Sequence, residues 1–147
     1  MKFSILVAAF CSSVVFAGVA ENKAKQAGDK AIEDKVAAYK TACGADVKVE
    51  SAHLDAGKIV VERRTEANVI AVAADVCAEA VSALGSLCKD ADYKAEVAKI
   101  KTIKCTPKKI EKAPYWEVKR DGTTISVTHA PTNSYYIEGI ALLKKLF

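Results

Sequence analysis

The chain has 147 residues, with 22 Lys and Arg against 18 Asp and Glu, and its formal net charge is +4. This length suits one domain, and a charge so close to neutral argues against a nucleic-acid partner. Hydrophobic residues make up 51% of the sequence, which excludes a disordered chain and permits a packed core.

The first twenty residues have the pattern of a secretory signal peptide. Lys2 precedes the apolar run 5–16, and small residues stand at Ala17 and Ala20, either of which fits a cleavage site. We expect residues 1–20 to be removed, which lowers the net charge from +4 to +3 because Lys2 is lost. No later apolar run approaches the roughly 18 to 20 residues of a membrane span, so we expect a soluble protein in the periplasm or outside the cell.

The mature chain is predicted to begin with a flexible lead-in followed by a helix. Residues 21–28 are polar and Ala-rich, and they hold no large apolar side chain. Asp29 is a good helix cap, and Gly44 can end the helix in the left-handed conformation. Between them, one apolar stripe at offsets of four, three and four comprises Ile32, Val36, Tyr39 and Cys43.

The next segment alternates apolar and polar residues, which predicts two strands. Val47 and Val49 lie in the first strand, Ile59 and Val61 lie in the second, and the turn residues 55–57 join them. We expect these strands to form a hairpin.

A long central helix follows, and it is the strongest pattern in the chain. Thr65 is a favourable N-cap, and an apolar stripe runs through Val69, Val72, Val76, Ala80 and Leu84. Asp90 or Asp92 can cap a shorter helix that reaches about Ile100. Residues 102–106 then read as a strand that Pro107 stops.

The C-terminal third predicts a hairpin and a helix. Asp121-Gly122 favours a two-residue type I′ turn, which pairs Val118 with Ile125 and Trp116 with Val127. Thr132, Asn133 or Ser134 can cap the last helix, whose stripe comprises Tyr136, Ile140, Leu143 and Phe147.

These elements predict one α+β domain over residues 29–147. Its antiparallel sheet of about five strands carries three to four helices on one face. Four cysteines remain after removal of Cys11 with the signal peptide, namely Cys43, Cys77, Cys88 and Cys105. An even number in an oxidising compartment predicts two disulfides.

The pairing of the cysteines depends on the central helix. If residues 65–88 form one continuous helix, Cys77 and Cys88 lie eleven residues and about 16 Å apart and cannot bond to each other. We therefore favour Cys43–Cys77 with Cys88–Cys105. A helix that ended at Gly85 would permit Cys77–Cys88 with Cys43–Cys105, and the spacing does not decide among the three possible pairings. The spacing matches neither a zinc site nor a redox motif.

Two histidines are the candidates for catalysis. His53 and His129, with a lysine, supply the groups for acid and base catalysis such as phosphodiester cleavage. His53 and Asp55 do not form a recognisable metal-ligand motif. Hydrolase, nucleotide and zinc-protease motifs do not occur, so we expect no cofactor and no metal.

Lysines and tyrosines are the candidates for binding. Residues 99–112 contain six lysines and a single acid, Glu111. This excess of positive charge suits an anionic envelope component or an acidic protein partner. Lysines at a solvated strand edge would give the same pattern. The six lysines are Lys99, Lys101, Lys104, Lys108, Lys109 and Lys112. We expect Trp116 in the core, and Tyr115 and Tyr135 at an exposed contact surface.

The function expected from these observations is binding. The sequence favours a small secreted or periplasmic non-enzymatic module whose partner is a protein or an envelope component. The alternative is a small secreted hydrolase that uses His53, His129 and a lysine. A purely structural envelope accessory protein has the same sequence features as the binding module.

Overall fold

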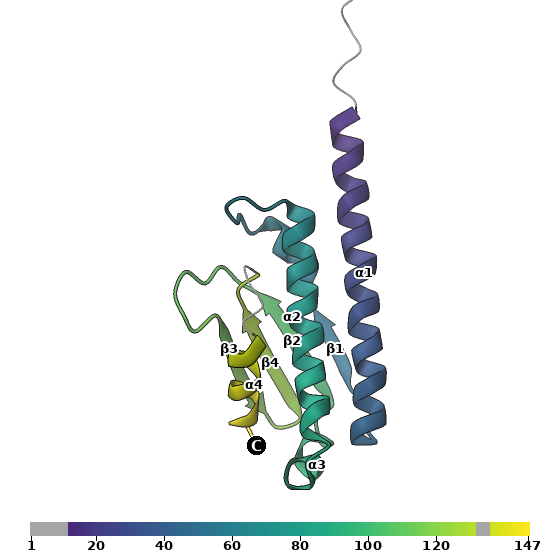
Figure 1. Ribbon diagram of the computed structural model, residues 1–147, viewed down its shortest axis with the longest axis vertical. Helices are drawn as coiled ribbons and strands as arrows, with labels where there is room; N and C mark the ends of the chain where they lie inside the picture. Colours follow the sequence, from purple (N-terminus) through teal and green to yellow (C-terminus); the bar gives the residue numbers. More distant parts are fainter. Residues whose placement is uncertain (1–11, 132–135) are drawn as a thin grey trace, which may run out of the picture.

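A mixed four-stranded sheet forms one layer of the protein. The computed structural model describes residues 12–131 and 136–147 (Figure 1). The strands run in the order β1-β2-β4-β3, in which β1, β2 and β4 are parallel and β3 is antiparallel to β4. The α+β class is therefore confirmed, but the expected antiparallel sheet of about five strands is wrong. The strands are β1 (Lys48–Ser51), β2 (Thr102–Pro107), β3 (Trp116–Asp121) and β4 (Thr124–His129).

The parallel pairing arises because the expected hairpin at residues 47–61 does not form. After β1 the chain enters a 3-10 helix, η1 (His53–Lys58), instead of turning back as a strand. Ala56 of η1 packs with Val69 and Ala73 of helix α2 (Glu66–Leu87). Burial of this small apolar cluster outweighs strand pairing by residues 59–61, and β1 pairs with β2 after a helical crossover.

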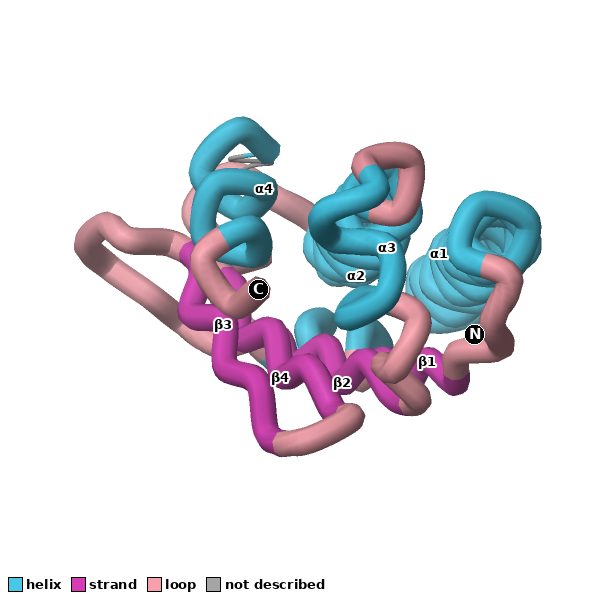
Figure 2. Tube along the Cα trace, turned by 90° about the horizontal axis from the view of Figure 1, so that it is seen from below, coloured by secondary structure: helices cyan, strands magenta, loops and turns pink. Residues whose placement is uncertain are grey.

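Helices cover one face of the sheet, as predicted (Figure 2). They are α1 (Ser12–Cys43), α2, the short α3 (Ala91–Val97) and α4 (Tyr136–Lys144). The core between the layers includes the fully buried Tyr39, Leu84, Ile103 and Ile125. The opposite face of the sheet carries hydroxyl and charged side chains, among them Thr102, Lys104, Thr106, Ser126 and Lys119.

Two expected helix caps are present. The Thr65 side chain accepts a hydrogen bond from the Asn68 N–H at 3.3 Å, and the Asp90 side chain accepts one from the Asp92 N–H at 3.1 Å. The expected caps Thr132, Asn133 and Ser134 lie outside the described residues. Helix α2 is long and apolar enough to cross a membrane, but 67% of its most apolar window is buried, as in the core helix of a globular protein.

Helix α1 is longer than the sequence predicted. Residues 21–28, expected as a flexible lead-in, continue the helix. Gly28 is buried where α1 passes α2, and a Cβ atom added to Gly28 would lie 2.5 Å from the Cβ of Ala74. The absence of a side chain at Gly28 therefore permits this close helix contact.

The C-terminal hairpin forms with a register two residues from the predicted one. Asp121 pairs with Thr124, Val118 with Val127, and Trp116 with His129. Gly122 has a φ of 54° and is the first residue of the two-residue loop, as a type II′ turn requires. A shift of two residues keeps every side chain on its expected face, and Trp116 is buried as predicted.

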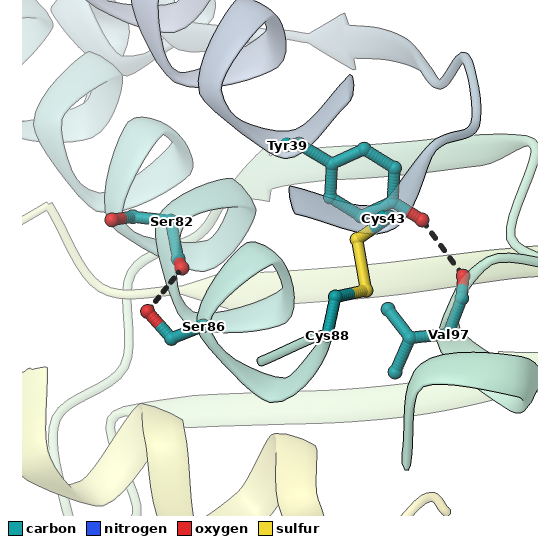
Figure 3. Close-up of a disulfide and its surroundings, with 6 residues drawn as sticks. All are labelled: Tyr39, Cys43, Ser82, Ser86, Cys88 and Val97. Atoms are coloured by element: carbon teal, nitrogen blue, oxygen red, sulfur yellow. Dashed lines mark hydrogen bonds between the residues drawn. A yellow bond between two sulfur atoms is a disulfide. The ribbon is translucent and has the colours of Figure 1, made fainter. Parts of the chain in front are cut away.

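Two disulfides are present, but the favoured pairing is wrong. Cys43 bonds Cys88 and Cys77 bonds Cys105. Helices α1 and α2 run side by side in the same direction (Figure 1). They do so because β1 lies between the two helices in the chain and returns along the sheet. Their last residues therefore meet, which joins Cys43 to Cys88 (Figure 3). The middle of α2 lies over β2, which joins Cys77 to Cys105.

Candidate functional site

The carboxyl ends of the three parallel strands meet at one edge of the sheet. Register places Ser51 of β1 beside Cys105, and Pro107 of β2 beside His129 of β4. Ligands of open sheets commonly bind outside this edge, where the chain leaves the strands. The apolar groove described below is built from residues that follow these strands. The polar cluster combines Ser51 and His53, at the end of β1, with Asp29 of α1.

His53 lies in a polar cluster drawn from three elements. The Ser51 Oγ lies 3.0 Å from His53 Nδ1, and the Asp29 Oδ1 of α1 lies 3.4 Å from His53 Nε2. His53 is only 3% exposed. The tautomer that suits both neighbours carries its proton on Nε2, since a carboxylate can only accept, and leaves Nδ1 to accept from the Ser51 hydroxyl. At this separation Nε2 makes no hydrogen bond to a described residue.

The cluster lines a cavity of about 290 Å³ together with three residues of α1 and β1. Burial lowers the pKa of His53 below its ordinary value; the Asp29 carboxylate opposes this change, and the Lys25 ammonium adds to it. The imidazole is therefore neutral at pH 7 and can accept a proton. The lining residues are Asp29, Ile32, Glu33, Val49, Ser51 and His53.

His129 lies in the core. It is fully buried opposite Trp116, and burial lowers its pKa to about 4 while the backbone of Ala130 opposes the shift. Neither ring nitrogen has a hydrogen-bond partner among the described residues. Strand β2 separates β1 from β4, so the ends of these two strands lie about 10 Å apart. The polar neighbours of His53 are therefore Ser51 and Asp29, and not His129.

Asp55 does not contact His53. Its carboxylate accepts a hydrogen bond of 2.7 Å from Lys58, three residues along η1. Among residues 12–131 and 136–147, no group of three His, Cys, Asp or Glu side chains is arranged to hold a metal ion.

The six candidate lysines are all exposed, but they do not form one patch. Lys99 and Lys101 precede β2, Lys104 lies on its outer face, and the other three follow it. Six residues of strand separate the two ends by about 20 Å. Lys99 pairs with Glu96, Lys104 with Glu50 at 3.6 Å, and Lys109 with Glu111 at 2.9 Å. Only Lys108, Lys109 and Lys112 share one loop.

The expected tyrosine surface is described only in part. Tyr115 is half-buried and packs against the core, and its carbonyl oxygen accepts a hydrogen bond of 2.9 Å from the Ala130 N–H. Tyr135 lies outside the described residues.

An apolar groove of about 270 Å³ lies beside the lysine loop. Residues 59–62, between η1 and α2, form one side of it, and residues 109–111, after β2, form the other, with Pro131 after β4. Val60 in this groove is 88% exposed. Its apolar lining comprises Ile59, Val60, Val61, Ile110 and Pro131, with Glu62, Lys109 and Glu111 among them.

Sequence reasoning missed the partners of His53 and the groove. Asp29 was recognised only as a helix cap, and nothing local links it to a histidine 24 residues later. Ser51 is two residues from His53, which in a strand places both side chains on one face; this spacing was the available signal. Ile59 and Val61 were assigned to a strand.

Comparisons of the chain with protein-family models, with curated proteins and with solved structures found no match.

Proposed function

We propose that this protein is a binding module, and that a polypeptide partner docks in the groove between residues 59–62 and 109–111. The observation that carries the proposal is Val60, which is 88% exposed in a groove with an apolar lining. Single exposed apolar residues are ordinary, but an apolar hollow with charged residues at its edge is typical of a binding site.

The charges near the groove suggest the chemistry of the partner. Lys109 is paired with Glu111, whereas Lys108 and Lys112 make no ion pair within the described part of the chain. Two unpaired ammonium groups on the loop at the groove favour carboxylates on the partner. The proposed ligand is therefore a peptide segment with a large apolar side chain flanked by Asp or Glu.

The proposed location is the periplasm or the exterior of the cell. Two disulfides are consistent with an oxidising compartment. Export rests on the sequence pattern of residues 1–20, and the mass of the exported protein should correspond to a chain that begins near Glu21.

Selection from a random-peptide display library on the folded mature protein tests the function directly. We expect enrichment of peptides with an apolar residue beside acidic residues. The Val60→Asp substitution should weaken their binding at least tenfold, because it places a charge in the apolar groove. Leu54→Asp is the matched control, since Leu54 is 45% exposed on η1 and does not line the groove.

A second comparison tests the role of the lysines. The double substitution Lys108→Gln/Lys112→Gln should reduce the affinity for the peptide and the salt dependence of binding. The control Lys99→Gln/Lys101→Gln removes the same charge at the far end of β2 and should leave both unchanged. The proposal fails if the selected peptides bind Val60→Asp as tightly as the wild-type protein, or if no peptide is enriched.

A further inference from the structure

We propose that Ser51, His53 and Asp29 form a hydrolytic site for short, uncharged acyl esters, separate from the groove. Ser51 ends β1, His53 begins η1, and Asp29 lies on α1, so three elements converge on one cavity. Ser51 is the nucleophile, His53 is the general base and acid, and Asp29 is the positioning residue.

The contacts are those that activate a serine hydroxyl. The Ser51 Oγ and His53 Nδ1 are 3.0 Å apart, within hydrogen-bond distance. The Asp29 Oδ1 is 3.4 Å from His53 Nε2, a separation that is common before a substrate binds. Nε2 is buried and has no hydrogen-bond partner among the described residues, although it lies beside this carboxylate. Either nitrogen of an imidazole can accept a proton while the other donates one. Nδ1 of His53 can therefore act as the base toward Ser51 while Nε2 faces Asp29.

The unpaired side of strand β1 supplies a hydrogen-bond donor for the negatively charged oxygen that forms when the serine attacks an ester. The Lys48 N–H and the Ala52 N–H donate to carbonyl groups on the β2 side. Because N–H groups alternate along a strand, the Ser51 N–H points to the other side. Strand β1 is an edge strand, so that side is open. The nucleophile's own N–H can therefore donate to the oxygen of a tetrahedral intermediate.

The reaction uses water as its only co-reactant. The Ser51 Oγ attacks the ester carbonyl carbon as its proton passes to His53 Nδ1, and the Asp29 carboxylate stabilises the imidazolium at Nε2. The carbon–oxygen bond of the ester then breaks, and His53 returns the proton to the leaving alcohol. Water then attacks the acyl-Ser51 ester and gives its proton to His53. The bond between the acyl carbon and the Ser51 Oγ breaks, and His53 returns the proton to the Ser51 Oγ as the acid leaves.

The cavity limits the substrate. Its volume of about 290 Å³ is at the lower limit for small-molecule sites. Ile32 and Val49 give it apolar walls, whereas the carboxylates of Asp29 and Glu33 disfavour anionic substrates. A short acyl chain on a neutral alcohol fits both conditions.

Labelling of the wild-type protein tests the site without any substitution. The mature protein should react with a fluorophosphonate, and peptide mass mapping should find the adduct on Ser51. The same protein should hydrolyse 4-nitrophenyl acetate. An absence of label on Ser51 under conditions that label a control serine hydrolase overturns the proposal.

Variants separate catalysis from folding. Ser51→Ala should lose both the label and the esterase activity, whereas Ser126→Ala, on the outer face of β4, should keep both. Asp29→Asn should lower the hydrolysis rate about 100-fold or more with thermal unfolding close to that of the wild-type protein. Val60→Asp should leave labelling unchanged, which separates this site from the groove. Equal hydrolysis by Ser51→Ala and the wild-type protein contradicts the proposal.

Discussion

The Tyr39 hydroxyl donates a hydrogen bond of 2.7 Å to the carbonyl oxygen of Val97, 58 residues later in the chain (Figure 3). Tyr39 is fully buried, and burial raises its pKa to about 12. The bond ties the last turns of α1 to α3, beside the disulfide between Cys43 and Cys88. A covalent and a polar link thus fasten the same end of the helical layer.

Tyr39→Phe should lower the free energy of unfolding by about 1 kcal/mol, because the apolar packing stays while one buried hydrogen bond is lost. The loss is modest because the Val97 carbonyl still accepts a bond of 3.0 Å from the Ile100 N–H. Urea unfolding of the two proteins measures the difference. A loss above about 3 kcal/mol would show that the hydroxyl has a larger role than this single bond.

Gly28→Ala should destabilise the protein by about 1 to 3 kcal/mol, although alanine is the better helix former. The new Cβ would lie 2.5 Å from the Cβ of Ala74. Ala27→Gly, at an exposed neighbouring position, is the control for helix propensity alone. The double variant Gly28→Ala/Ala74→Gly should recover part of the loss, and thermal unfolding measures all three. Additive losses in the double variant would contradict a direct clash.

Local patterns predicted most of the helices correctly. The caps Thr65 and Asp90 are present, because a cap depends on residues that are neighbours in the chain. Residues 21–28 have no large apolar side chain, yet they are helical. Their contact with α2 depends on the close approach of Gly28 to Ala74, 46 residues later. The spacing of neighbouring apolar residues does not predict a contact between residues so far apart in the chain.

Pairing across the chain was harder to predict. Alternation at Val47 and Val49 indicated a strand but not the direction of its partner, because parallel and antiparallel strands share the period of two. The polar site has the same limitation, since His53 meets Asp29 only after α1 and η1 have packed. The disulfides follow from the parallel course of α1 and α2, which the position of β1 determines.

Peptide mapping under non-reducing conditions checks the disulfide pairing. Trypsin leaves Cys77 and Cys88 on one peptide, residues 65–89, so a glutamate-specific protease is needed to cleave after Glu79. We expect Cys43 linked to Cys88 and Cys77 linked to Cys105. Replacing either pair with alanine should cost about 3 to 4 kcal/mol of unfolding free energy, because each bond closes a long loop. Any other pairing would contradict the parallel packing of α1 and α2.

Acid should weaken the protein through His129. Burial lowers its pKa to about 4 in the folded state, whereas an unfolded chain titrates this group near 6.5. The unfolded state therefore binds more protons below pH 6.5, and stability that is fully present above that pH is lost as the pH falls toward 4. The loss amounts to about 3 kcal/mol.

Urea unfolding of the wild-type protein and of His129→Leu, measured from pH 7 to pH 4, isolates this contribution. His53, which titrates in the same direction, is common to both proteins and cancels in the difference. Parallel curves for the two proteins would show that His129 is not buried in the neutral form.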